Sequence, residues 1–167
     1  MEHRFFWNGP FSQWYPCQFE IDGVAFTSAE QAMMHSKAQL FGDAQAAERI
    51  MAATDPGHQK ALGRTVRGFS ERVWRAKRYD IVLRNNTAKF SQNRGLRRKL
   101  FQTGEDILVE ASPVDTVWGI GLDADAAART DPADWPGENL LGKALTEVRA
   151  LLSIDFADEA ARGLRLR

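Results

Sequence analysis

The spacing of hydrophobic residues predicts short amphipathic helices with few strands between them. The most regular helical stripe follows Asn139, which is predicted to cap the helix, and it recurs every three or four residues. Its members are Leu141, Ala144, Leu145, Val148 and Leu152. Strict alternation occurs in Phe19–Phe26, where Asp22-Gly23 is a two-residue turn that tolerates positive φ. This segment is therefore predicted to be an antiparallel hairpin.

Capping residues predict where the other helices begin. Thr27-x-x-Glu30 and Ser28-x-x-Gln31 are two overlapping capping boxes at the start of a helix that extends to about Leu40. Three more helices are predicted from Asp43 to about Ala53, from Asp55 to Gly63 and from Ser70 to about Thr87, with a shorter one over Leu96–Phe101.

The remaining segments complete the predicted architecture. Phe5–Trp7 and Ile107–Ala111 are strand candidates, and residues 112–138, rich in Asp, Pro and Gly, are predicted to form loops. The sequence thus predicts an α+β fold, a single mostly helical domain over residues 1–167 with a small antiparallel sheet. Its core spans about residues 5–152 and is followed by a C-terminal tail, residues 153–167.

Charge is distributed unevenly along the chain. The 167 residues are 44% hydrophobic and 26% charged, as in globular rather than disordered proteins. The 22 basic and 22 acidic residues cancel, yet the net charge is −3 over residues 1–63, +10 over residues 64–99 and −7 over residues 104–167. The basic stretch indicates an anionic partner, whereas overall neutrality argues against a bulk nucleic-acid binder.

Several classes of protein are excluded by what the sequence lacks. The single cysteine, Cys17, cannot form an intramolecular disulfide, and the three histidines are too scattered for a metal site. Walker, dinucleotide-binding and nucleophile-elbow motifs are absent, so no metal and no cofactor are predicted. Without an apolar run of signal-peptide or membrane-span length, the expected location is cytoplasmic, with no membrane partner.

Glu30 and Lys37 share one face of the first predicted helix, because they lie two turns apart. A carboxylate in a first helical turn is stabilised by the helix dipole, which suits a group that must stabilise a developing cation. The alternative is that Glu30 only completes the capping box, worth about 1 kcal/mol. Spacing alone favours that alternative.

Asp115 and Trp118 follow the strand candidate 107–111, in a loop that also contains Gly119 and Gly121. Loops at strand ends often carry reactive groups, and glycine lets the backbone approach a ligand closely. The alternatives are a turn-forming aspartate and a core tryptophan. The pattern alone favours these structural interpretations about as much as the functional one.

Trp74 lies among the cations of the helix that follows Ser70, and Arg64 precedes that helix. An aromatic ring among cations can stack on a heterocycle while the cations hold a phosphate. The alternative, a core tryptophan on a helix with a solvated basic face, is slightly favoured by the pattern. Lys89 and Asn93 extend the same basic stretch.

Motifs from Phe11 to about Leu152 follow one another in an order that resembles the NADAR (YbiA-like) family of N-glycoside hydrolases. They are Phe11-Ser-Gln-Trp-Tyr-Pro16, the hairpin, Ser28-Ala-Glu-Gln-Ala-Met-Met34, Leu62-Gly-Arg64, Trp74, Lys89-Phe-Ser-Gln-Asn93, Thr103-Gly-Glu105, Leu108-Val-Glu-Ala-Ser112, Asp115-Thr-Val-Trp-Gly-Ile-Gly121 and Pro136-Gly-Glu-Asn-Leu-Leu-Gly142. Each motif is weak alone, but the ordered set is specific.

The resemblance implies cleavage of the C1–N bond between ribose and a base-like amine. It implies phosphoribosylamino-pyrimidine intermediates of riboflavin biosynthesis as substrates, with release of ribose 5-phosphate. Other members of the family are linked to ADP-ribose, including its removal from guanine in nucleic acid. Glu30, Trp74 and Asp115 match the catalytic positions of the family. The expected substrate contacts are Lys37, Arg64, Trp118, Gly119 and Asn139.

Two departures from the family pattern bear on the site. Gln13 and Trp14 stand where the family more often has Asn-Phe, which puts a substrate contact by that asparagine in doubt. Gln31 follows Glu30 where histidine is frequent, so no catalytic histidine is expected there.

The expected mechanism passes through an oxocarbenium-like transition state. Asp115 activates water or stabilises the cation, and Glu30 is its carboxylate partner. Trp74 or Trp118 stacks on the heterocycle, while Lys37 and nearby cations hold the phosphate of a small phosphorylated riboside. The alternatives are an ADP-ribosyl glycohydrolase that acts on ADP-ribosylated nucleic acid and a non-catalytic module that binds ADP-ribose or a nucleotide.

Overall fold

The computed structural model describes residues 2–164 and divides them into two compact units. We call residues 13–93 the central unit, and residues 2–12 together with 94–164 the terminal unit. Whether the whole chain forms one domain stays a prediction. Within the described residues, no helix is both long and apolar enough to cross a membrane.

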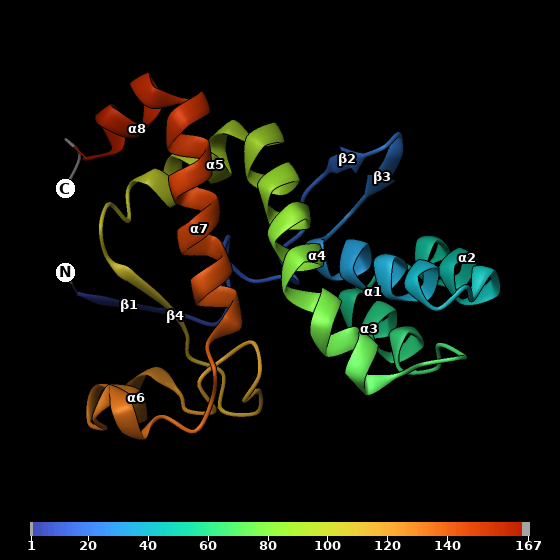
Figure 1. Ribbon diagram of the computed structural model, residues 1–167. Coiled ribbons are helices and arrows are strands. Elements are labelled where there is room, and N and C mark those ends of the chain that lie inside the picture. The colour runs from blue at the N-terminus through green and yellow to red at the C-terminus, as the bar shows by residue number, and fades with distance from the viewer. Residues whose placement is uncertain (1, 165–167) are drawn as a thin grey trace. The chain divides into compact units, whose positions relative to one another are not determined.

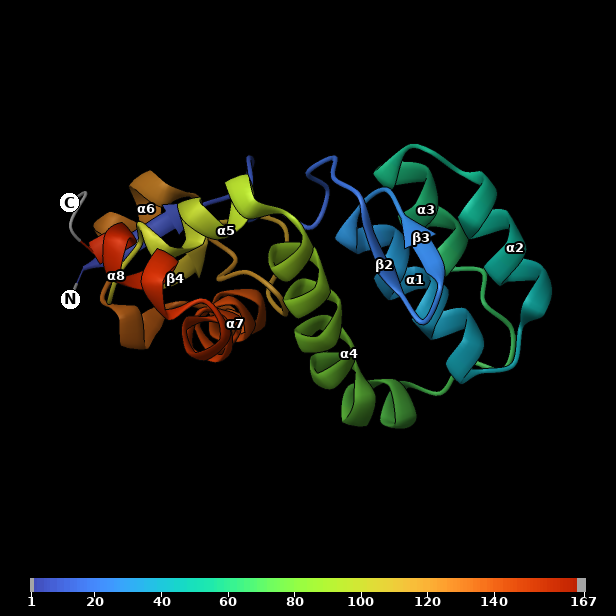
Figure 2. The same ribbon diagram turned by 90° about the horizontal axis from the view of Figure 1, so that it is seen from above.

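The central unit is built around its first helix. Its elements are β2 (Phe19–Ile21), β3 (Val24–Phe26), α1 (Ala29–Leu40), α2 (Ala44–Ala52), α3 (Pro56–Gly63) and α4 (Glu71–Gln92). Helix α1 packs against α2, α3 and α4, and the β2–β3 hairpin lies beside it (Figures 1 and 2). The hairpin is antiparallel as predicted, with positive φ at Asp22 and Gly23.

The predicted helix caps of the central unit are confirmed. Ser28, Asp43, Asp55 and Ser70 each accept a hydrogen bond from a backbone N–H in the first turn of the helix that follows. Each bond satisfies one of the donors that a helix start leaves without an intrahelical partner.

Helix α4 extends five residues beyond its predicted end at Thr87. Two polar side chains near this end form hydrogen bonds to carbonyl groups of the helix. Thr87 Oγ1 donates to the carbonyl of Leu83 at 2.8 Å, and Asn93 Nδ2 donates to that of Lys89 at 2.8 Å. Gln92 also exchanges two 2.8 Å hydrogen bonds with the backbone of Glu20 in β2, which fixes the end of the helix.

The terminal unit combines a parallel strand pair with helices. Its elements are β1 (His3–Phe6), α5 (Arg94–Phe101), β4 (Ile107–Glu110), α6 (Ala124–Ala128), a 3-10 turn (Pro132–Asp134), α7 (Leu140–Asp155) and α8 (Ala157–Leu164). Strand β1 pairs with β4, and α7 packs on β4 through the predicted apolar stripe, all of which is buried. The fold is therefore mostly helical with a small antiparallel sheet, as predicted, to which the parallel pair is added.

The predicted C-terminal tail is structured as far as it is described. Helix α7 continues to Asp155, and α8 then packs on α5 (Figure 1). The Arg97 guanidinium of α5 lies 3.8 Å from the centre of the Phe156 ring. The chain from 153 to 164 thus contributes to the terminal unit, and residues 165–167 lie outside the described residues.

Gly142 provides a test of the packing between α7 and β4. A Cβ atom at Gly142 would overlap the carbonyl oxygen of Leu108 and the side-chain amide of Asn139. Because both atoms are held by the fold, we expect Gly142→Ala to lower the free energy of unfolding by about 1–3 kcal/mol. Urea denaturation followed by circular dichroism measures this change.

Gly95→Ala is the matched control, since no atom lies within 4 Å of a Cβ at this helical position. Alanine is preferred to glycine in a helix by roughly 0.5–1 kcal/mol, so stability should hold or rise. Equal losses in the two variants would contradict the packing argument.

Candidate functional site

Helix α1 carries two of the predicted site residues in the central unit. Glu30 is only 4% exposed, and its backbone N–H donates to the carbonyl of Gln13 at 3.0 Å. Lys37 lies two turns further on and is half-buried. Burial lowers the pKa of Lys37, as does Arg64, while the charges of Glu30 and Glu71 oppose that shift. Glu30, Glu71 and Arg64 are therefore close enough to Lys37 to influence its pKa.

The cap of α1 is formed by Ser28 and Gln31. Of the two overlapping capping boxes, the structure forms Ser28-x-x-Gln31, in which Ser28 Oγ accepts from the N–H of Gln31 at 3.0 Å. The Gln31 side chain reaches back and accepts from the N–H of Thr27 at 2.8 Å. The structural role that spacing favoured for Glu30 is thus performed by its neighbour.

Two aromatic rings lie around Lys37. Its Nζ is 4.6 Å from the centre of the Phe69 ring and 5.6 Å from that of Trp74, both within cation–π range. Arg64 is exposed at the end of α3. Trp74 is only 8% exposed, so little of its ring is open to a stacking heterocycle.

Gly63 brings the segment with Arg64 close to α1. The sequence suggests that this glycine terminates α3, but Gly63 is the last residue inside the helix and Arg64 follows it in right-handed conformation. A Cβ at Gly63 would overlap Sδ of Met34 in α1. Gly63 therefore allows α3 to pack closely against α1, and it is not needed for a positive φ.

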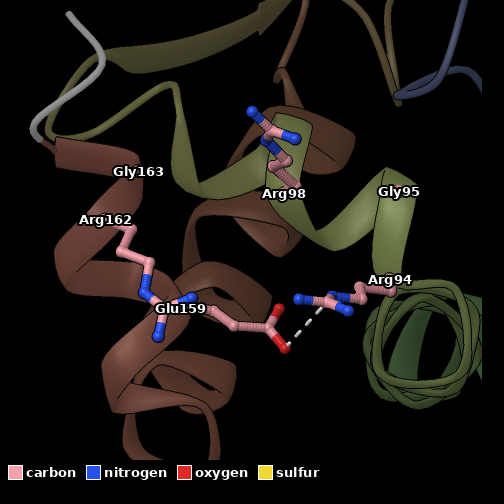
Figure 3. A pocket seen from close by; sticks show the side chains of 6 residues that line it. All are labelled: Arg94, Gly95, Arg98, Glu159, Arg162 and Gly163. Atoms are coloured by element: carbon pink, nitrogen blue, oxygen red, sulfur yellow. Dashed lines mark ion pairs between the residues drawn. The ribbon is translucent and has the colours of Figure 1, made fainter.

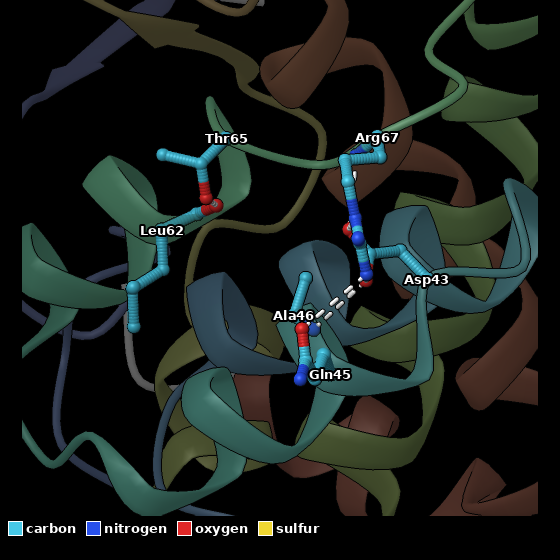
Figure 4. Close-up of polar contacts among 6 residues, drawn as sticks. All are labelled: Asp43, Gln45, Ala46, Leu62, Thr65 and Arg67. Atoms are coloured by element: carbon cyan, nitrogen blue, oxygen red, sulfur yellow. Dashed lines mark hydrogen bonds and ion pairs between the residues drawn. The ribbon is translucent and has the colours of Figure 1, made fainter.

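The loop after α3 is held by Asp43, the N-cap of α2 (Figure 4). Asp43 Oδ2 accepts from the backbone N–H of Arg67 at 2.9 Å, and the Arg67 guanidinium donates to Oδ1 at 3.2 Å. The N–H of Ala46 also donates to Oδ1, at 3.1 Å. Bonds from Arg67 are the main reason that the pKa of Asp43 falls to about 2. This ion pair fixes the segment between Arg64 and Phe69.

Lys89 differs from the sequence interpretation, which placed it in an exposed basic stretch. The structure buries it completely, and burial lowers its pKa to about 8. Arg78 and Arg97 of the same stretch are also buried, so only some of the cations in residues 64–99 are exposed to solvent. A lysine with such a pKa is partly neutral near neutral pH and chemically more reactive. No periodicity in the sequence distinguishes it from its exposed neighbours.

Cys17 lies in the same unit as Lys89. Its backbone N–H donates to the carbonyl of Thr27 at 3.1 Å, and the residue is partly buried. Burial raises the pKa of the thiol, an effect that the charge of Lys89 partly opposes.

Asp115 occupies a fixed loop of the terminal unit. Its Oδ1 accepts two backbone hydrogen bonds, from Val117 at 2.9 Å and from Trp118 at 2.8 Å. Within residues 2–164, Oδ2 accepts none, and the residue is partly exposed. One oxygen thus holds the loop, while the other can face a ligand.

Backbone contacts fasten this loop to the start of α7. Asn139 and Leu141 donate to the carbonyls of Gly119 and Trp118, at 3.1 Å in each case. A Cβ at Gly119 would meet the carbonyl oxygens of Glu110 and Asp115 at 2.9 and 3.0 Å. The conformation of the Asp115 loop is therefore set by neighbouring backbone. Trp118 is partly exposed, and Gly119 is buried.

Asn139 bonds to β4 rather than capping α7 through its side chain. Oδ1 accepts from the N–H of Glu110 at 3.0 Å, and Nδ2 donates to the carbonyl of Leu108 at 2.9 Å. The residue stands at the N-cap with φ 53° and makes no side-chain cap bond. The helix start is as predicted, but the amide positions β4 and thereby the loop that follows it.

The predicted site residues fall into two groups. Glu30, Lys37, Arg64 and Trp74 belong to the central unit; Asp115, Trp118, Gly119 and Asn139 belong to the terminal unit. In the described part of the chain, no group of three His, Cys, Asp or Glu side chains could hold a metal ion. Gln13, which the motif comparison left in doubt, exchanges 2.9 and 3.0 Å hydrogen bonds with the Asn86 amide. It positions Glu30 through its backbone.

A fold with these features and this motif order defines an α+β protein of the NADAR class. A model of the NADAR domain matches residues 5–153, and the chain belongs to the NADAR family. An N-glycosidase of Acanthamoeba polyphaga mimivirus is 46% identical over 144 residues, which cover 83% of this chain and 85% of that protein.

Two other relatives extend the comparison. The NMR structure of the Escherichia coli protein YbiA has a TM-score of 0.76 and 25% identity, covering 93% of this chain and 88% of that one. A riboflavin biosynthesis protein of Vibrio vulnificus is 29% identical over 160 residues, which cover 92% of this chain and 40% of that protein.

The ion pair between Asp43 and Arg67 gives a pH-dependent prediction. Because the folded-state pKa of Asp43 is about 2, below its ordinary value of 3.8, its carboxylate stabilises the fold above about pH 4. That contribution is lost as the pH falls toward about 2. Asp43→Asn keeps an acceptor but removes the charge. We expect its urea midpoint to lie below that of the unmodified chain at pH 7, with the gap closing toward low pH.

Asp55→Asn is the control, because Asp55 also caps a helix, accepting from the N–H of His58 at 2.8 Å, and has no arginine partner among residues 2–164. Its effect on the midpoint should be smaller at pH 7. A pH-independent gap in Asp43→Asn would contradict the role of the ion pair.

Proposed function

We propose that this chain hydrolyses the ribosyl C1–N bond of phosphoribosylamino-pyrimidine intermediates of riboflavin biosynthesis and releases ribose 5-phosphate. The observation that carries the proposal is a buried carboxylate, Glu30, whose charge acts on Lys37, as does the charge of Arg64. To cleave a phosphorylated riboside, an enzyme needs an anion that stabilises the positive charge on the sugar and cations that bind the phosphate.

Family membership supplies the reaction class. Relatives of this chain, including those from mimivirus and Escherichia coli, are named N-glycosidases. The chain is a hydrolase that acts on N-glycosyl bonds. Support for the riboflavin intermediate as substrate comes from the relative in Vibrio vulnificus, which is named a riboflavin biosynthesis protein.

Cleavage of the C1–N bond leaves positive charge on the ribose ring, so negative charge near C1′ lowers the barrier. Asp115 is the group that activates water or stabilises the cation. Its Oδ1 is committed to two backbone N–H groups, which fix the direction of the carboxylate. Oδ2 is the oxygen through which it accepts the proton of the attacking water or faces the cation.

Glu30 contributes the second carboxylate. It lies in the first turn of α1, where the partial positive charge of the helix end favours an anion. Gln31 completes the cap, and we assign the Glu30 side chain to the reaction.

The substrate is held by cations and one aromatic face. Arg64 can bind a phosphate with two parallel hydrogen bonds. Lys37 adds a point charge beside it. Trp118, which is more exposed than Trp74, stacks on the heterocycle, and the Trp74 ring makes a cation–π contact with Lys37. Gly119 and Asn139 hold the loop that carries Trp118 and Asp115.

Asp115→Asn tests the assignment of the catalytic carboxylate. The asparagine keeps Oδ1 as an acceptor for Val117 and Trp118, so the loop should persist while the negative charge is lost. We expect turnover to fall by about 10²–10⁴-fold, the usual contribution of acid–base groups. Mass spectrometry of released ribose 5-phosphate measures it. Asp123→Asn is the matched control, because Asp123 also accepts a backbone N–H, from Ala126 at 2.8 Å, and should leave turnover unchanged.

Glu30→Gln should reduce turnover by a comparable factor, with Glu48→Gln on the exposed face of α2 as its control. Near-normal turnover in a folded Asp115→Asn protein would remove Asp115 from the mechanism. The same assay with ADP-ribosylated guanine in DNA identifies the alternative substrate, because free ADP-ribose would be released. Saturable binding of all candidates without any sugar released would make the chain a binding module.

A further inference from the structure

A second candidate site lies in the terminal unit, between α5 and α8 (Figure 3). It is a pocket of about 560 Å³, within the size range of small-molecule sites. Its lining residues are Arg94, Gly95, Arg98, Glu159, Arg162 and Gly163. None of them is among the residues assigned to the glycosidase reaction.

The pocket is far from Asp115. Helix α7 has its first residue against the Asp115 loop and its last residue directly before α8. Its 16 residues span about 24 Å at 1.5 Å per residue. A ligand the size of a nucleotide cannot reach both ends of this helix, so the pocket is a separate site.

The single acid of the pocket is neutralised by an arginine outside the lining. Arg97 is buried beneath Glu159 and donates to both carboxylate oxygens at 3.0 Å. These bonds are the main cause of the lowered pKa of Glu159. Arg94 points toward the same carboxylate from the opposite wall, at 3.9 Å, and its side chain is 79% exposed (Figure 3). The acid is therefore already satisfied.

Two further cations line the pocket, Arg98 from α5 and Arg162 from α8, and the charge of Arg162 also helps to lower the pKa of Glu159. Arg98 and Arg162 are exposed, and within residues 2–164 neither makes an ion pair. With Arg94, they place three guanidinium groups around one cavity. Arginine binds phosphate through two parallel N–H bonds, and its flat face can stack on a base.

Two glycines shape the cavity. At Gly163 a Cβ would meet Phe101 at 2.8 Å, so α8 can approach α5 only without a side chain there. At Gly95 no atom lies within 4 Å of a Cβ, so this part of the wall is open. Gly95 also belongs to the first turn of α5, whose positive dipole end adds to the charge of the arginines.

We propose that this pocket binds the phosphate of a free nucleotide-sized phosphate ester, at a site separate from that of the glycosidase reaction. The side chains of Arg98 and Arg162, which point apart in Figure 3, turn toward the phosphate when it binds, and Arg94 closes the rim. The proposal does not depend on the proposed hydrolase activity.

The test is a titration of the isotope-labelled full chain with adenosine 5′-monophosphate, followed by ¹H–¹⁵N NMR. The amides of Gly95 and Gly163 should shift and saturate, and adenosine, which lacks the phosphate, should leave them unchanged. The same shifts should persist in Asp115→Asn, which separates this site from the reaction site.

Variants give the decisive comparison. Replacing Arg98 and Arg162 together by alanine should raise the dissociation constant at least about tenfold, since two charge-assisted contacts are lost. Lys99→Ala removes an exposed cation of α5 that does not line the pocket, and it should change the constant less than about twofold.

Three outcomes would overturn the proposal. One is the absence of saturable shifts at Gly95 and Gly163, and another is an equal effect of Lys99→Ala, which would mean unspecific attraction by charge. The third is saturable binding of a single-stranded oligonucleotide without binding of the mononucleotide. In that case α5 would be a nucleic-acid contact instead of a nucleotide pocket.

Discussion

Two buried glutamine amides hold together the helix ends on which the central unit depends. Gln31 Nε2 donates to the carbonyls of Ile50 and Ala53 at the end of α2, at 3.2 and 3.3 Å. Gln59 of α3 donates to the same carbonyl of Ala53 at 2.7 Å and accepts from Ser28 Oγ at 2.9 Å. Each buried carbonyl left without a donor would cost roughly 1–3 kcal/mol. The starts of α1 and α3 and the end of α2 are thereby fixed to one another.

This arrangement explains how the central unit can keep a buried carboxylate in its first helix. The Gln31 side-chain oxygen accepts at the cap, and its NH₂ group donates to carbonyls at the end of α2. A neutral histidine at this position would have one N–H donor instead of two. In the terminal unit, backbone hydrogen bonds between the Asp115 loop and the start of α7 fix the conformation of that loop before any ligand binds.

Local signals predicted most of the helices. The prediction of loops over residues 112–138 was wrong at α6, which the local cap Asp123 begins, whereas contacts between distant residues account for other differences. The caps at Ser28, Asp43, Asp55 and Ser70 depend on residues three positions away, and all four are formed. The pairing of β1 with β4 joins residues about a hundred positions apart, which no periodicity encodes. No periodicity encodes the burial of Lys89 either. The pocket between α5 and α8 is also unpredictable from local pattern, because α5 belongs to the basic stretch and α8 to the predicted tail. The candidate residues came from motif order, and their grouping within each unit came from the structure.

Cys17 gives the chain a built-in kinetic probe. As the only cysteine, it is the only site at which a thiol reagent can react, and its raised pKa keeps it mainly protonated and slow at neutral pH. Its N–H is bonded to Thr27, directly before the cap of α1. The rate of thiol modification therefore reports how often this region of the central unit opens. Ligands that bind near Glu30 would slow this rate, which would reveal binding without any turnover.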